Sequence, residues 1–220
     1  MTYGASATEA VIHEKSSIPL VYAGFYEPGE TAVNSKNATG CGYKVPLSSF
    51  LRYLKRLKTI ESLGIVFNSL EEDSLLQYKT MQALAEQQNI KTDKIDIRSK
   101  ADLGKLESVQ SDGIFITGSS LVHLWLDDII MSFEKHQIPV ADIFPDDTDS
   151  GVLMTLYQPS SSQGQMAAEM AWKILLGTKP TDISAYIFRE TELVFNLVEA
   201  KHLGIDFPIQ LLIEATRVIE

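Results

Sequence analysis

Short apolar runs alternate with amphipathic stretches along the chain. Four runs are rich in β-branched or aromatic residues and are bounded by turn-forming residues: 18–22, 63–67, 113–117 and 138–143. Short runs that are apolar at nearly every position are typical of strands buried on both faces of a parallel sheet. We therefore predict four such strands.

Between these runs, apolar residues recur with the period of an α-helix. The helical faces are Leu47, Phe50, Leu51, Leu54 and Leu57; Leu75, Tyr78, Met81 and Ala85; the stretch 121–134; and Met166, Met170 and Ile174. Strands that alternate with helices imply a parallel sheet with right-handed crossovers. The sequence therefore predicts an α/β fold.

The predicted α/β pattern is complete from residue 63 and incomplete before residue 60. The earlier part has one strand, a loop that contains Gly40 and Gly42, and one helix, and residues 1–4 resemble the end of a strand. So few strands do not make a parallel sheet. We expect the first lobe to lack strands that would precede residue 1.

Composition and charge narrow the function classes. The 220 residues are 45% hydrophobic and 22% charged, as in ordinary globular proteins, and the formal net charge of −10 disfavours polyanionic partners such as nucleic acid. No apolar run reaches the roughly 18 residues of a membrane span, and the start has no signal-peptide pattern. Cys41 is the single cysteine, which excludes an intrachain disulfide.

The motifs of the common enzyme classes are absent. We find no GxSxG elbow, P-loop, GxGxxG fingerprint or HExxH pair, and the histidines at 13, 123, 136 and 202 lie far apart in the sequence. We interpret these histidines as surface or helix-capping residues. The sequence predicts a protein that is not an enzyme and that has no metal or cofactor.

Small and hydroxyl residues mark three turns between a strand and a helix. They are the stretch 4–10, the stretch 117–120 that contains Gly118 and Ser119, and Asn68 with Ser69, ahead of Ser74. Ser6 and Glu9 match a capping box, and the first amides of such a helix suit a carboxylate or phosphate. The alternative is a plain helix cap. Because ligands gather at the carboxyl ends of parallel strands, the three turns favour a small polar ligand.

Two further groups of residues each allow two interpretations. Phe25 and Tyr26 could stack on a ligand or pack in the core. The acidic residues 146, 147 and 149 could meet a cation, or form a solvated loop.

Several segments, in order, resemble the substrate-binding proteins of ABC transporters, in particular those that bind tryptophan or tyrosine. The segments that carry the resemblance are 4–10, 18–24, 37–40, 63–68, 151–156, 174–180 and 194–220. The resemblance implies the type I periplasmic-binding-protein fold, in which two Rossmann-like α/β lobes joined by hinge strands close on a ligand. It also implies that the chain lacks the family's signal and its first strand–helix units.

The resemblance implies an assignment of lobes. Residues 1–60 form the incomplete first lobe, 61–147 the second, 148–185 a return to the first, and 186–220 a segment that crosses back to the second. The open first lobe would favour self-association of the chain. The expected location is periplasmic or at the cell surface, and the expected partner is a membrane permease.

The expected ligand is an amino acid or similar small zwitterion. The lobe-one residues Ser6, Ala7 and Thr8 would hold its carboxylate, and Asp142 or Asp146 would meet its ammonium group. The other expected ligand-binding residues are Phe25, Asn68, Ser74, Gly118 and Ser119. The alternative role is the ligand-sensing module of a signalling protein.

Overall fold

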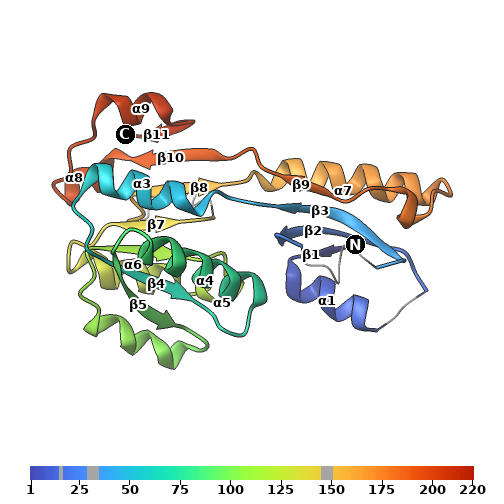
Figure 1. Ribbon diagram of the computed structural model, residues 1–220, viewed down its shortest axis with the longest axis horizontal. Helices are drawn as coiled ribbons and strands as arrows, with labels where there is room; N and C mark the ends of the chain where they lie inside the picture. The colour runs from blue at the N-terminus through green and yellow to red at the C-terminus, as the bar shows by residue number, and fades with distance from the viewer. Residues whose placement is uncertain (15–16, 29–34, 145–150) are drawn as a thin grey trace. The chain divides into compact units, whose positions relative to one another are not determined.

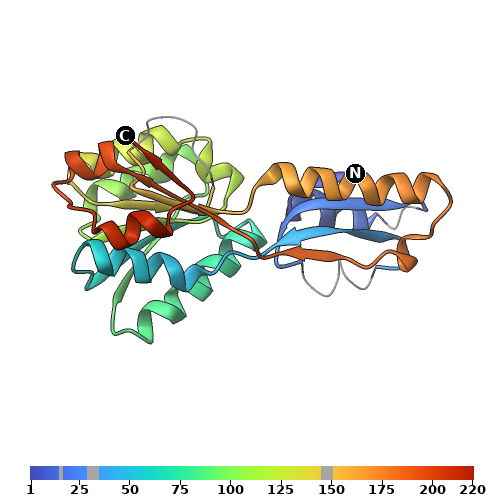
Figure 2. The ribbon, with the colours of Figure 1, turned by 90° about the horizontal axis from the view of Figure 1, so that it is seen from above.

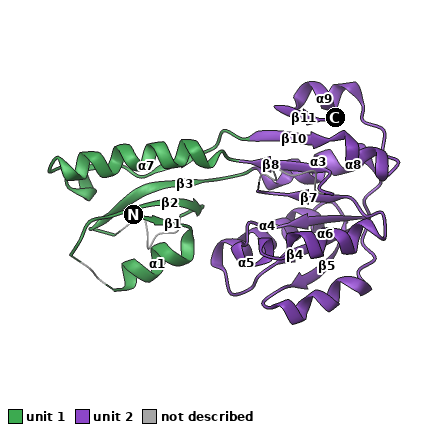
Figure 3. Cartoon of the chain, turned by 180° about the vertical axis from the view of Figure 1, so that it is seen from behind, with its two compact units in different colours: residues 1–45, 158–191 green, residues 46–157, 192–220 purple. Residues whose placement is uncertain are grey.

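The computed structural model describes residues 1–14, 17–28, 35–144 and 151–220, which divide into two compact units. Unit 1 comprises residues 1–45 and 158–191, and unit 2 comprises 46–157 and 192–220, so the chain passes between them three times (Figure 3). This division differs from the sequence-based one in residues 46–60 and 148–157, which belong to unit 2, and in residues 186–191, which belong to unit 1. Helix α3 (Leu47–Leu57) accounts for the first difference, because its Phe50 packs on Phe115, with ring centroids 4.9 Å apart.

Unit 1 contains a four-stranded parallel sheet in the order β1-β2-β3-β9, with a helix on each face (Figure 1). The strands are β1 (Thr2–Tyr3), β2 (Leu20–Tyr26), β3 (Ala38–Tyr43) and β9 (Tyr186–Phe188). Val21 and Ala23 pack on helix α7 (Ser160–Leu175), which Figure 2 shows running along the sheet. Tyr22 points the other way, toward Ala5 of helix α1 (Ala5–His13), since successive strand residues face opposite sides.

The expected loop around Gly40 and Gly42 is wrong: both residues lie inside strand β3. A Cβ at Gly40 would lie 2.2 Å from the Tyr22 carbonyl oxygen, and one at Gly42 would lie 2.3 Å from Pro28. The two glycines therefore let neighbouring chain segments approach β3 closely, which is a role of glycine within strands.

Cys41, between these glycines, is fully buried, and its thiol donates a hydrogen bond to the Gln163 carbonyl oxygen at 3.2 Å. Burial raises the pKa of the Cys41 thiol to about 11. The thiol is therefore protonated at neutral pH, as expected for a structural cysteine.

Unit 2 contains a seven-stranded sheet in the order β11-β10-β8-β7-β6-β4-β5, in which only the β8–β10 pair is antiparallel. Phe115 of β6 meets α3 on one face, while its neighbours Ile114 and Ile116 pack on the other with Ile129 and Phe133. The strands are β4 (Ser62–Phe67), β5 (Lys91–Asp96), β6 (Gly113–Ile116), β7 (Val140–Asp142), β8 (Met154–Tyr157), β10 (Glu192–Asn196) and β11 (Arg217–Ile219). The helices are α3, α4 (Glu72–Glu86), η1 (Lys100–Ser108), α5 (Ser120–His123), α6 (Leu126–Glu134), α8 (Leu197–His202) and α9 (Ile209–Glu214), and η2 (Pro180–Asp182) belongs to unit 1.

The α/β fold with sheets that are mainly parallel is confirmed, and the four predicted strands correspond to β2, β4, β6 and β7. The single helix expected over 121–134 is instead two helices, α5 and α6. None of the helices in the described ranges is both long enough and apolar enough to cross a membrane.

Candidate functional site: polar groups at the carboxyl ends of parallel strands

Three neighbouring strands of unit 2 end in polar residues. Strands β4, β6 and β7 lie side by side and parallel, and their carboxyl ends carry Asn68, Thr117 and Asp142. All three side chains are at most 2% exposed. Two of the three turns that the sequence singled out, at Asn68 and at 117–120, therefore lie at this sheet edge, whereas the stretch 4–10 belongs to unit 1. The three side chains at this edge are buried rather than open to solvent.

Glu71 joins the turn after β4 to the start of α5. One carboxylate oxygen, Oε1, accepts hydrogen bonds from Asn68 Nδ2 at 2.9 Å, Ser119 Oγ at 3.0 Å and the Leu121 amide at 3.0 Å. The other, Oε2, accepts one from the Ser120 amide at 2.9 Å. The carboxylate thus satisfies amides at the start of α5 that would otherwise be open to an external anion.

Two more polar side chains follow Glu71 at intervals of three residues and face the same turn. Ser74 Oγ lies 2.7 Å from Thr117 Oγ1 and accepts a hydrogen bond from the Asn68 amide at 2.9 Å. The Gly118 amide donates to Gln77 Oε1 at 2.7 Å. Because residues three apart lie on one helix face, the start of α4 presents a polar stripe to the β6 turn.

Asp142 has a partly buried partner, His123. Nε2 of His123 lies 2.9 Å from Asp142 Oδ2 and 3.1 Å from Oδ1, and Nδ1 lies 2.7 Å from the Ser119 carbonyl oxygen. The Phe144 amide donates to Asp142 Oδ1 at 3.0 Å. Burial by itself would lower the pKa of His123, but the negative charge of Asp142, with a smaller contribution from Glu71, raises it above 6.5. The expectation that His123 is a surface or capping residue is therefore wrong.

The start of α1 in unit 1 is built differently. The helix begins at Ala5 after Gly4, whose φ of 86° suits glycine, and no side chain caps it. The predicted capping box of Ser6 and Glu9 is therefore wrong, because Ser6 lies inside the first turn. Ser6 and Ala7 are exposed.

Thr8 and Phe25 both lie in the interior of unit 1. Thr8 is fully buried, and its hydroxyl donates to the Gly4 carbonyl oxygen at 2.7 Å and lies 3.0 Å from Thr2 Oγ1. Phe25 is 4% exposed and packs edge-on against Tyr22, with ring centroids 6.0 Å apart. The Thr8 hydroxyl is thus engaged within the loop that begins α1.

Asp146, the remaining predicted ligand residue, lies outside the described residues. Within the described ranges, no group of three or more His, Cys, Asp or Glu side chains could hold a metal ion.

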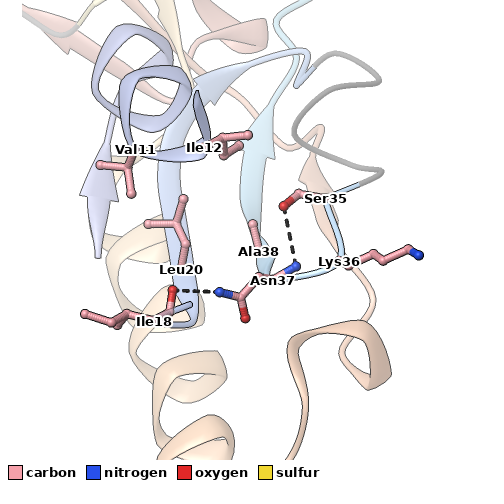
Figure 4. Close-up of a pocket in the computed structure, with 8 residues that line it drawn as sticks. All are labelled: Val11, Ile12, Ile18, Leu20, Ser35, Lys36, Asn37 and Ala38. Carbon is pink, nitrogen blue, oxygen red and sulfur yellow. Dashed lines mark hydrogen bonds between the residues drawn. The ribbon is translucent and has the colours of Figure 1, made fainter. Parts of the chain in front are cut away.

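Two surface pockets lie away from these strand ends. The first, of about 250 Å³, is at the amino ends of β2 and β3, where Asn37 Nδ2 donates to the Ile18 carbonyl oxygen at 2.9 Å (Figure 4). Its lining residues are Val11, Ile12, Ile18, Leu20, Ser35, Lys36, Asn37 and Ala38. The second, of about 380 Å³, is in unit 2 and is lined by residues of 197–212. Neither contains a predicted ligand residue.

Sequence reasoning missed the contacts of Glu71, Gln77 and His123. A signal was present, because Glu71, Ser74 and Gln77 are spaced by three and precede the buried Met81 and Ala85 on the inner face of one helix. Polar residues on a core-facing stripe need partners, which indicates a buried network.

The chain belongs to the ABC transporter substrate-binding protein family, whose model matches residues 2–219. The family consists of binding proteins, not enzymes, in agreement with the sequence prediction. A search of the curated proteins finds no match.

Solved structures show the same fold. An ABC domain from Streptococcus pneumoniae in complex with L-Trp has a TM-score of 0.90 and 21% identity, over 99% of this chain and 77% of that one. A conserved domain protein from Vibrio cholerae has a TM-score of 0.91 and 21% identity, over 98% and 76%. A ligand-free, open substrate-binding protein with adhesive properties from Clostridium difficile has a TM-score of 0.70 and 19% identity, over 99% and 76%. These likenesses support the type I periplasmic-binding-protein fold.

Proposed function

We propose that this protein is the extracytoplasmic solute-binding component of an ABC transporter and that it binds an amino acid or a similar small zwitterion. The proposal rests on one observation above all. The first turn of α1 has no side-chain cap and no acidic residue, whereas the corresponding strand ends of unit 2 carry the partly exposed carboxylate of Glu71 and the buried carboxylate of Asp142.

The amides at the start of α1 are the proposed site for the ligand carboxylate. The Thr8 amide already donates to the Gly4 carbonyl oxygen, but the amides of Ala5, Ser6 and Ala7 come before this first intrahelical donor and so have no carbonyl acceptor within the helix. Amides at a helix N-terminus carry partial positive charge and suit an anion without a basic side chain. The exposed Ser6 hydroxyl could add a hydrogen bond, and Thr8 would orient the loop.

Asp142 is the proposed counter-ion for the ligand ammonium group, with Asp146 as the other candidate. The Asp142 carboxylate already binds His123, so an ammonium group would share it or take the place of the imidazole. Asn68, Ser74, Gly118 and Ser119 would then support the site through the hydrogen bonds that fix the turns around it.

An amino acid ligand is supported by the L-Trp complex of the pneumococcal domain with the same fold. Phe25 is the proposed contact for an apolar ligand side chain. The alternative role, as a ligand-sensing module, would use the same site. The family match favours transport, which requires a permease as partner.

A melting-temperature screen against the twenty amino acids tests the proposal. A ligand at a hundredfold excess over its Kd stabilises the native state by about 2.7 kcal/mol, which is readily measured. Calorimetric titration of any hit gives stoichiometry, expected to be one per chain. The absence of any shift with every amino acid would contradict the proposed ligand class.

A further inference from the structure

The side-chain amide of Gln77 is fully buried, and only its oxygen forms a hydrogen bond among the described residues. It lies on the inner face of α4, one turn after Ser74, and its Oε1 accepts the Gly118 amide at 2.7 Å. That contact fixes the orientation of the amide, because the amide nitrogen could not accept the hydrogen. Nε2 is therefore left as a donor, and it has no hydrogen-bond partner among the described residues.

An unpaired donor in the interior is costly. Leaving a buried N–H group unsatisfied is unfavourable, so such groups are rare in native structures and each one calls for an explanation, such as a further partner. The other two polar side chains on this helix face, Glu71 and Ser74, both have hydrogen-bond partners. Glu71 has four donors, and Ser74 has two partners.

The unpaired Nε2 lies beside the backbone of Gly118, near the ring of Phe144. A Cβ built on Gly118 would be 3.3 Å from Gln77 Nε2 and 3.1 Å from Phe144 Cζ, so both atoms approach the same point. Phe144 follows the end of β7 and is half-buried, with its ring 4.8 Å from that of His123. The Phe144 ring is therefore the half-buried aromatic group beside the Gln77 amide.

We infer that Gln77 Nε2 donates a hydrogen bond to the bound ligand and selects ligands that carry an uncharged oxygen acceptor, such as a hydroxyl or an amide carbonyl. The inference rests on the proposed function and deepens it. A second carboxylate on the ligand would be disfavoured, because Glu71 and Asp142 already place negative charge on the turns beside Gly118 and Phe144.

Pairs of amino acids that differ by one acceptor oxygen test this selectivity. Suitable pairs are tyrosine with phenylalanine and threonine with valine. A site built to bond an acceptor leaves its donor unpaired when the acceptor is missing, so we expect the oxygen-bearing member of a bound pair to bind about 5- to 100-fold more tightly. Titration calorimetry at fixed pH gives the ratio.

Two variants of Gln77 link the preference to this residue. In Gln77→Met the donor is lost and we expect the two members of the pair to bind equally. In Gln77→Glu the neutral carboxyl keeps both an acceptor for Gly118 and an O–H donor, so the preference should return at low pH and vanish as this carboxyl ionises. The control is Met81→Leu, on the same buried helix face, which should keep the wild-type preference.

The outcomes separate the inference from the proposed function. A wild-type protein that binds amino acids without preference within any bound pair would overturn the role of Gln77 alone. If Gln77→Met kept the preference, the role of Gln77 would also be overturned, and the partner of Nε2 would be a buried water molecule. A wild-type protein that binds no amino acid would overturn the proposed function, and the inference with it.

Discussion

Helices α1 in unit 1 and α5 in unit 2 both follow a parallel strand through a turn of small and hydroxyl residues, yet their first amides meet different surroundings. The start of α5 is occupied by the Glu71 carboxylate and by Ser119, whose hydroxyl accepts the Val122 amide at 3.0 Å. The start of α1 has neither a side-chain cap nor an acidic residue in its first turn. Two similar sequences thus produce one internally satisfied helix start and one that no side chain caps.

The difference comes from a residue distant in sequence. Glu71 lies about 50 positions before the amides that it binds, on the turn that follows β4. A local pattern of small residues predicts where amides will point, but not whether another part of the chain supplies the anion. Removing the carboxylate from α5 and adding one to α1 are therefore complementary tests.

Glu71→Gln should have the largest effect on stability. The amide retains one oxygen acceptor but turns an N–H₂ group toward donors, so at least one charge-assisted hydrogen bond is lost, at about 1.5–3 kcal/mol. We expect the free energy of unfolding of unit 2 to fall by that amount. Urea unfolding can be followed by Trp125, which packs on the core of unit 2, in a Trp172→Phe background that removes the tryptophan of unit 1.

The matched control is Glu72→Gln, one position further along at an exposed site. Surface changes of this kind alter stability by about 0.5 kcal/mol or less. Equal effects of the two variants would mean that the Glu71 contacts contribute nothing to the stability of unit 2.

Ala7→Asp makes the start of α1 resemble that of α5. Ala7 is exposed in the first turn, where a carboxylate interacts favourably with the helix N-terminus by about 0.3–1 kcal/mol. It would also compete with the carboxylate of the ligand, so we expect affinity to fall at least about tenfold, or 1.4 kcal/mol, without loss of stability. Calorimetric titration measures this, with Ala7→Asn as the uncharged control. Unchanged affinity in Ala7→Asp would remove α1 from the proposed site.

The His123–Asp142 pair gives unit 2 a pH dependence that unit 1 lacks at its α1 turn. The pKa of His123 is raised in the folded state above the ordinary 6.5, so the pair's full stabilisation is present below pH 6.5. It is lost as the pH rises through the raised folded pKa, at about 1.4 kcal/mol per unit of pKa difference. The stability advantage of the wild type over His123→Gln should therefore shrink above pH 6.5. An advantage that grows with pH in urea titrations would contradict the pairing.

The hydrophobic pattern predicted the architecture well where strands are buried on both faces. β4, β6 and β7 were found because nearly all of their residues are apolar, whereas β5 is an edge strand in which four of the six residues are charged and was missed. Strand β3 was missed because glycines occupy its centre, where backbone contacts from Tyr22 and Phe25 leave no room for a side chain.

The candidate site was only partly predictable. Asn68, Ser74 and Ser119 could be grouped at one sheet edge, because parallel strands share the direction of their carboxyl ends. That they are tied to one another through Glu71 and Thr117 depends on contacts between residues about 40–50 positions apart. That Gln77 Nε2 has no hydrogen-bond partner among the described residues depends on the positions of single atoms, so hydrophobic periodicity could not predict it.

Thr8→Val tests the smallest difference between the two helix starts. The Ser119 hydroxyl caps its helix, whereas the Thr8 hydroxyl donates back to the Gly4 carbonyl oxygen and contacts Thr2 within its own loop. Valine keeps the shape and removes the buried hydroxyl contacts, so unit 1 should lose about 1 kcal/mol of stability. Hydrogen exchange of the β2 amides would measure this loss, and Thr8→Ser should restore it. If Thr8 orients the loop for the ligand, affinity should also fall in Thr8→Val and recover in Thr8→Ser. A stability loss without any change in affinity would make Thr8 purely structural and would leave the backbone amides of α1 as the proposed contact.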